Sequence, residues 1–146
     1  MKEIRMESDC LGCSLANKRV DAQIVYEDDR VTCLLDIAPL HEGHVLILPK
    51  QHYHDLDELD EVTAAAVMKT SQQIAKGLKA LFQPDGITII QNNGSFNDLT
   101  HYHMHVFPRY QADGFTWVEP LETTNAAGRL PETRDKLVHV LSEACG

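Results

Sequence analysis

The feature that most constrains this chain is the segment 101–109, HYHMHVFPR, in which histidines alternate with apolar or aromatic residues. Because successive side chains of a strand point to opposite faces, this alternation predicts a half-buried β-strand with its three imidazoles on one face. At about 3.3 Å of rise per residue, neighbouring imidazoles would lie roughly 6–7 Å apart. A helix would scatter them, because positions i and i+2 diverge around its axis.

A row of imidazoles on a strand has three chemical uses, which the segment alone leaves open. A neutral imidazole can attack phosphorus and form a covalent intermediate. A His-x-His pair can bind a metal ion, and any of the three can act as a general acid or base near neutral pH. The consistently apolar residues between the histidines favour such a site over a chance polar face.

Cys10 and Cys13 form a C-x-x-C pair near the N-terminus. Two thiolates at this spacing commonly supply half of a tetrahedral zinc site, and the other two ligands must come from elsewhere in the chain. The pair alone is equally consistent with no zinc. A thioredoxin-like redox role is disfavoured, because no βαβ pattern surrounds the pair.

The composition of the chain limits its size class and the kinds of partner that it can bind. A chain of 146 residues, 43% of them hydrophobic, can form one domain with a buried core. Its net charge of −9 argues against a long nucleic acid, but not against a single nucleotide. Since no apolar run approaches a membrane span and residues 1–10 lack a secretory apolar core, we expect a cytoplasmic protein with no membrane partner. Its four cysteines are then not expected to form a disulfide framework.

The order of the predicted elements indicates an α+β domain with a mainly antiparallel sheet, one long helix and a C-terminal helix. Short apolar or alternating runs predict strands at 23–27, 31–37, 44–49, 87–91 and 101–109. The run 44–49, HVLILP, is typical of a central strand buried on both faces. The long helix ends at 84–86, and its apolar face passes through Val67, Ser71, Ile74, Leu78 and Leu81.

Residues 101–107 match the HφHφHφφ signature, with φ apolar, and so resemble the histidine-triad (HIT) superfamily. Four further motifs, in the same order, are similar to its Hint-type bacterial branch: LDI at 35–37, GHVLILPKQH at 43–52, QNNG at 91–94 and FPRY at 107–110. The resemblance covers roughly residues 9–118. It implies a HIT-like fold for a single domain, 1–146, with a C-terminal tail and helix at 119–146 outside the motifs.

The resemblance also implies roles for the matching residues. His103 would be the nucleophile at the α-phosphorus of a nucleotide, and His105 would contact the phosphate and stabilise charge in the transition state. Asp36 would hold the ribose hydroxyls, Ile37 would pack against the base, and Asn92 would open the loop before the triad. Zinc-containing members bind the ion through positions that are here Cys10, Cys13, His52 and His101.

The loop before the triad departs from the family pattern. Members usually carry a Gly-Gln-Ser/Thr sequence whose amide and hydroxyl contact the phosphate and leaving group. Here the loop within 93–100 reads SFNDLT at 95–100 and is about two residues shorter. We expect Asn97 to replace the amide, and Thr100 or Ser95 the hydroxyl. The Asp98 carboxylate would be unfavourable beside a phosphate unless it faces away or orients a histidine.

The function implied is a nucleotide hydrolase or transferase that acts on the α-phosphate of purine nucleotide conjugates through a nucleotidyl-histidine. The conjugates would be adenosine phosphoramidates or dinucleoside polyphosphates. Two alternatives stay open: a nucleotide binder with little turnover, and a metal-dependent hydrolase with the triad 101, 103 and 105 as ligands. The family usually forms homodimers, and we expect the interface on the long helix and the strand before it.

Four other polar residues carry weaker expectations. Lys50 and Arg109 could add positive charge near the phosphate, although each suits an ordinary surface position equally well. His41 and His44 flank the turn between two predicted strands and are expected to be structural or solvated.

Overall fold

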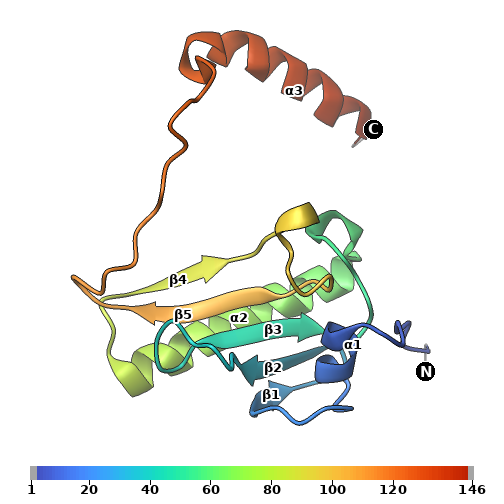
Figure 1. Cartoon of the computed structure of the whole chain (residues 1–146). Coiled ribbons are helices and arrows are strands. Elements are labelled where there is room, and N and C mark those ends of the chain that lie inside the picture. Colours follow the sequence, from blue (N-terminus) through green and yellow to red (C-terminus); the bar gives the residue numbers. More distant parts are fainter. Residues whose placement is uncertain (1–2, 145–146) are drawn as a thin grey trace. The chain divides into compact units, whose positions relative to one another are not determined.

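The computed structural model describes residues 3–144, which fall into two compact units that divide between Asp113 and Gly114. The larger unit holds the helices α1 (Leu11–Ala16) and α2 (Glu61–Phe82) and a five-stranded sheet, and the smaller unit holds α3 (Leu130–Ala144) (Figure 1). Short 3₁₀ turns lie at Leu56–Glu58, Gly94–Phe96 and Ala126–Arg129. None of the helices within residues 3–144 has the length and apolar character that a membrane crossing requires.

All neighbouring strands of the sheet pair antiparallel, in the order β1-β2-β3-β5-β4. The strands are β1 (Ile24–Glu27), β2 (Val31–Leu35), β3 (Val45–Pro49), β4 (Gly86–Ile90) and β5 (Met104–Arg109). The predicted α+β class with a mainly antiparallel sheet is therefore confirmed. β3 is an interior strand with all five residues buried, as its continuous apolar run predicts.

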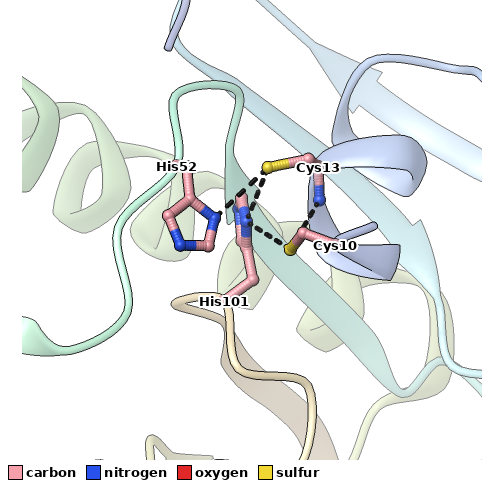
Figure 2. A group of neighbouring side chains, drawn as sticks. All are labelled: Cys10, Cys13, His52 and His101. Atoms are coloured by element: carbon pink, nitrogen blue, oxygen red, sulfur yellow. Dashed lines mark hydrogen bonds between the residues drawn. The ribbon is translucent and has the colours of Figure 1, made fainter. Parts of the chain in front are cut away.

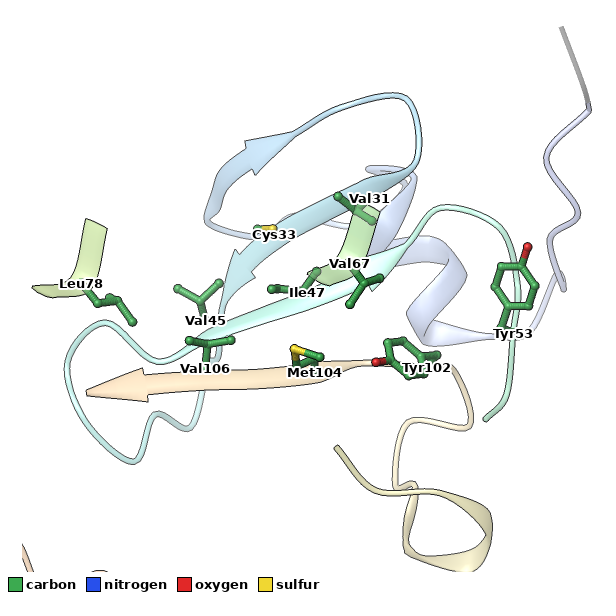
Figure 3. Packing of buried hydrophobic residues seen from close by; sticks show 10 residues of the cluster. All are labelled: Val31, Cys33, Val45, Ile47, Tyr53, Val67, Leu78, Tyr102, Met104 and Val106. Carbon is green, nitrogen blue, oxygen red and sulfur yellow. The ribbon is translucent and has the colours of Figure 1, made fainter. Parts of the chain in front are cut away.

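The main core lies between α2 and one face of the sheet (Figure 3). Val67 and Leu78 of α2 pack there with residues of β2, β3 and β5, among them Cys33, Val45, Ile47, Met104 and Val106. The prediction that Leu81 belongs to this apolar face is wrong, because its side chain is 74% exposed. The last turn of α2 packs Phe82 against the core instead.

A smaller core covers the opposite face of the sheet, beneath α1. Ala16 of α1 packs with Leu34, Leu46 and Leu48 of β2 and β3, and the Thr32 hydroxyl donates to the Ala16 carbonyl at 2.6 Å. Side chains that alternate with Met104 and Val106 along β5 face this side. The histidines of the segment 101–109 are therefore directed toward the face that α1 shares.

The histidine segment differs from its prediction in two ways. β5 begins only at Met104, and the N–H of Tyr102 donates to the Tyr53 carbonyl at 2.7 Å instead of entering the sheet. His101 and His103 are also buried, with 0% and 3% exposure, so the segment is covered on both faces. The expectation of a half-buried strand over 101–109 is wrong because α1 and the loops cover the histidine side as well.

In the smaller unit, α3 starts at Leu130, one residue before Pro131. Every described residue of this helix is exposed. Its apolar residues include Leu137, Val140 and Leu141, each more than half exposed.

Candidate active site and metal cluster

Four side chains with metal-binding atoms meet at one buried point: Cys10, Cys13, His52 and His101 (Figure 2). Cys13 Sγ lies 3.3 Å from His52 Nδ1 and 3.5 Å from His101 Nδ1, and Cys10 Sγ lies 3.6 Å from His101 Nδ1. With Zn–S near 2.3 Å and Zn–N near 2.0–2.1 Å, sulfur and nitrogen ligands of a tetrahedral zinc ion lie about 3.5 Å apart. The donor set and its spacing therefore fit zinc.

The backbone holds these atoms in place. Cys10 is the N-cap of α1, and its sulfur accepts from the N–H of Cys13 at 3.4 Å. Gly12 lets α1 approach the triad segment, because a Cβ at this position would lie 2.3 Å from the Cβ of His101. His101 Nε2 donates to the Pro49 carbonyl at 2.8 Å, which leaves the lone pair on Nδ1, the nitrogen that faces the cysteines.

Burial shifts the pKa of two members of this cluster, Cys13 and His101. It raises the pKa of the Cys13 thiol and lowers the pKa of His101 to about 4. A neutral imidazole is the form that binds a metal ion, and a bound divalent cation would stabilise the thiolates against the effect of burial. The cluster is thus suited to a cation rather than to free charged side chains.

The next histidine along the chain is held through its opposite nitrogen. His103 Nδ1 lies 2.9 Å from the carbonyl oxygen of His101. Since a carbonyl only accepts, Nδ1 carries the hydrogen and the lone pair is on Nε2. An imidazole in this tautomer can attack an electrophile from Nε2.

The tautomer of His105 is set by a chain of hydrogen bonds that begins at the backbone. The N–H of Leu40 donates to His44 Nδ1 at 3.1 Å, so His44 carries its hydrogen on Nε2. That nitrogen lies 2.9 Å from His105 Nδ1 and donates to it. His105 therefore carries its own hydrogen on Nε2. The rings of His103 and His105 are 4.9 Å apart between centroids.

Burial, together with the neighbouring histidines His103 and His44, lowers the pKa of His105 to about 4. Burial also lowers the pKa of His44. Both imidazoles are therefore neutral at pH 7, as the hydrogen-bond chain between them requires. Sequence reasoning missed this role of His44, and the signal that could have found it is strand register. Val45 pairs with Val106, which places His44 against the end of the triad.

Asp36, His44 and His105 form a second group with ligand atoms within 4.8 Å of one another. The His44 and His105 nitrogens that face each other are already joined by a hydrogen bond, so this group is explained without an ion. The three triad histidines do not converge on one point, because His101 Nδ1 faces the cysteines. Among residues 3–144, neither potential metal-binding group contains all three.

The other predicted nucleotide-binding residues differ in their exposure to solvent. Asp36 approaches His44 Nε2 at 3.6 Å and His105 Nδ1 at 3.9 Å. The Ile37 side chain is 98% exposed, and Asn92 is exposed in the loop after β4. Asn97 is buried, and its amide donates to the His54 carbonyl at 2.7 Å, so it anchors the loop.

The two cations expected near the phosphate are paired with carboxylates. Lys50 Nζ is paired with Glu27 at 2.9 Å, and the Arg109 guanidinium is paired with Asp113 at 2.6 Å. Asp98, by contrast, places a carboxylate oxygen 3.4 Å from His103 Nε2. The group beside the expected nucleophile is therefore an anion.

Comparison with known sequences supports a family assignment. A sequence model of the HIT domain matches residues 17–112. An uncharacterized HIT-like protein of Methanocaldococcus jannaschii is 37% identical over 107 residues, which are 72% of this chain and 82% of that protein. An adenylylsulfatase of Arabidopsis thaliana is 32% identical over 110 residues, which are 74% of this chain and 56% of that protein.

Solved structures show the same fold. A HIT family protein from Bacillus anthracis superposes with a TM-score of 0.82 at 27% identity, covering 95% of this chain and 99% of that one. A zinc-bound histidine triad family protein from Mycobacterium smegmatis gives a TM-score of 0.69 at 28% identity, covering 90% of this chain and 97% of that one.

Proposed function

This chain belongs to the HIT family, and from that premise we propose that it is a nucleotide hydrolase or transferase with His103 as its nucleophile. Its substrates would be purine nucleotide conjugates, adenosine phosphoramidates or dinucleoside polyphosphates, cleaved at the α-phosphorus. The related adenylylsulfatase of Arabidopsis thaliana supports an activity on adenylyl conjugates.

The observation that carries this proposal is the 2.9 Å hydrogen bond between His103 Nδ1 and the His101 carbonyl. It directs the lone pair of a buried imidazole to Nε2, which is the form that a nucleophile needs. The Nε2–H of His105 would donate to a phosphate oxygen. Asp36 would then hold the ribose hydroxyls, with Ile37 and Asn92 at the nucleoside and Asn97 as the anchor of the loop.

The reaction would proceed in two displacements. His103 Nε2 forms a bond to the α-phosphorus while the bond to the leaving group breaks with its electron pair on the leaving atom. An amine leaving group takes up a proton from solvent. Water then attacks the nucleotidyl-histidine, the N–P bond breaks toward His103, and a proton returns to solvent with release of the nucleoside monophosphate.

We assign a structural role to a zinc ion held by Cys10, Cys13, His52 and His101. Four protein ligands complete a tetrahedral shell and leave no open position for substrate. The zinc-bound relative from Mycobacterium smegmatis supports zinc as the ion. Since His101 also supplies the carbonyl that orients His103, fixing His101 would steady the nucleophile.

The test is AMP release from adenosine 5′-phosphoramidate by wild type and by His103→Asn. Loss of a covalent nucleophile should lower kcat by more than about 10³-fold. Asparagine retains a donor for the His101 carbonyl, so thermal unfolding and zinc content should match wild type and report an intact fold. Equal AMP release by the two proteins would refute the nucleophile assignment.

A second candidate is a nucleotide-binding protein with little turnover. The observation in its favour is the Asp98 carboxylate 3.4 Å from His103 Nε2, where an anionic phosphate must arrive. Isothermal titration with AMP separates the two. Binding by wild type without turnover of any conjugate would select the binder.

We also propose a homodimer, with a corrected interface. The strand before the long helix cannot contribute an edge, because β3 is interior and fully buried. β4 is an edge strand with Ile89 half exposed, and α2 exposes Met68 and Leu81 by 57% and 74%. Light scattering should give a dimer mass for wild type and a monomer mass for the double variant Ile89→Lys, Leu81→Lys. A wild-type monomer would contradict the proposal.

A further inference from the structure

The loop that departs from the family pattern places a carboxylate beside the nucleophile. Asp98 Oδ1 lies 3.4 Å from His103 Nε2, although the Asp98 side chain is 88% exposed. Its charge reaches further into the site, because Asp98 is also one of the groups that act on the pKa of His105. A substrate at His103 must therefore share its space with a solvated anion.

The position of Asp98 is fixed by its neighbours. The buried Asn97 amide donates to the His54 carbonyl at 2.7 Å, and the Asn97 carbonyl accepts from the N–H of Thr100 at 3.4 Å. On the other side, Leu99 packs against the smaller core beneath α1. Both residues that flank Asp98 are thus held by the body of the fold. The exposed side chain between them projects toward His103 while remaining free to adjust to a ligand.

The two cations that the sequence offered for the phosphate are paired with other carboxylates. Lys50 and Arg109 are engaged by Glu27 and Asp113, and Asp36 adds a second carboxylate next to His44 and His105. A polyphosphate, sulfate or carboxylate leaving group would be repelled by this arrangement, and an ammonium group would be attracted.

We infer that Asp98 is a specificity-determining residue that selects leaving groups by charge, favouring amines that carry a second, cationic ammonium over anionic leaving groups. The inference rests on the proposed function. As His103 Nε2 bonds to phosphorus, the P–N bond breaks with its electron pair on nitrogen, and solvent supplies the proton. The Asp98 carboxylate takes no part in these bonds and acts on the charge at the far end of the departing amine.

Three AMP phosphoramidates that differ only in that distant charge provide the test. Their amines are n-butylamine, 1,4-diaminobutane and 4-aminobutyrate, which end in a neutral, a cationic and an anionic group. At a separation near 4 Å in water, one unit charge corresponds to a change in kcat/KM of about fivefold. Wild type should rank the cationic substrate above the neutral one and the neutral above the anionic one. The ratios should shrink as salt screens the charges.

Asp98→Asn should bring the three values of kcat/KM together, and Asp98→Lys should invert their order. Asp29→Asn makes the same change in net charge at another exposed aspartate and should keep the wild-type ranking. Circular dichroism of each variant verifies its fold before kinetics.

Equal kcat/KM for the three substrates in wild type would overturn the inference, while the released AMP would uphold the proposed function. A wild-type ranking that persists in Asp98→Asn would overturn the role of Asp98 alone. Absence of AMP release from all three substrates would overturn the proposed function and this inference together.

Discussion

Two neighbouring histidines of one segment serve two different sites. His101 belongs to the cysteine–histidine cluster and His103 is the proposed nucleophile, and the two rings present opposite nitrogens to their sites. His101 donates from Nε2 to the Pro49 carbonyl and turns Nδ1 toward two thiols. His103 donates from Nδ1 to the His101 carbonyl, which leaves Nε2 as the proposed nucleophile. The ring nitrogen that donates to a backbone carbonyl thus decides which of the two nitrogens keeps its lone pair.

The two sites are linked in one direction. His101 supplies a ring nitrogen to the cysteine–histidine cluster and also the carbonyl that accepts from His103. His103 is not a member of this cluster. A variant that loses a ligand of the cluster should therefore also have a lower catalytic rate. A variant that loses His103 should keep the cluster intact.

The largest effect is expected from Cys10→Ser. Loss of a thiolate should abolish zinc binding and lower the free energy of unfolding by about 4 kcal/mol or more, because bound metal contributes directly to folding. The zinc content should fall from about one ion per chain to a small fraction, and a chelator should lower the melting temperature of wild type but not that of Cys10→Ser. The matched control is Cys33→Ala, which removes a buried core thiol outside the cluster and should retain zinc. Zinc retained at full stoichiometry by Cys10→Ser would contradict the assigned ligand set.

Two glycines probe the approach of α1 to the triad segment. In Gly12→Ala the new Cβ would meet the Cβ of His101 at 2.3 Å, and neither atom can rotate away. We expect a loss of about 3 kcal/mol of stability, since overpacking at a rigid contact falls at the high end of its usual cost. Gly77→Ala in α2 meets nothing within 4 Å and should stabilise by up to about 1 kcal/mol. Chemical denaturation of both variants measures the contrast, and similar values would show that α1 is not tightly held.

The sequence was sufficient to predict the fold class and the four residues that meet in the cysteine–histidine cluster. Fold class follows from local runs such as 44–49, whose continuous apolar character matches an interior strand. Cys10 and Cys13 are marked by their C-x-x-C spacing and His52 by the family resemblance, and the structure brings all three to His101.

Sequence patterns could not predict the residues whose roles depend on strand register or on the path of a loop. His44 reaches His105 only because β3 pairs with β5, and Asp98 reaches His103 only because Asn97 anchors a shortened loop. The burial of His101 and His103 likewise comes from α1 and the loops, which local alternation does not record. Contacts between distant segments decide all of these cases.

A substitution at His44 should affect the proposed nucleophile site and leave the metal cluster unchanged. Without His44, His105 loses the donor that sets its tautomer, and the cost of a buried group left unpaired is about 1–3 kcal/mol. We therefore expect His44→Ala to lower kcat by roughly 10- to 100-fold, with little change in KM. His44→Gln retains an N–H donor and should recover part of the loss, and zinc content should stay at the wild-type value in both. A failure of glutamine to exceed alanine would argue against the hydrogen-bond chain.

The smallest expected effect is the loss of stability that His105 causes as the pH falls. Burial holds the pKa of His105 near 4, below the ordinary value of 6.5, so the unfolded chain takes up this proton first as the pH falls. The contribution of His105 to stability is thus complete above pH 6.5 and declines as the pH falls toward 4. Between pH 6.5 and 5, wild type should lose about 1 kcal/mol relative to His105→Gln, allowing for partial solvent screening. Urea unfolding at several pH values measures this difference. Any acid release of zinc is common to both proteins and cancels, so parallel stability curves would mean that His105 is not held neutral by burial.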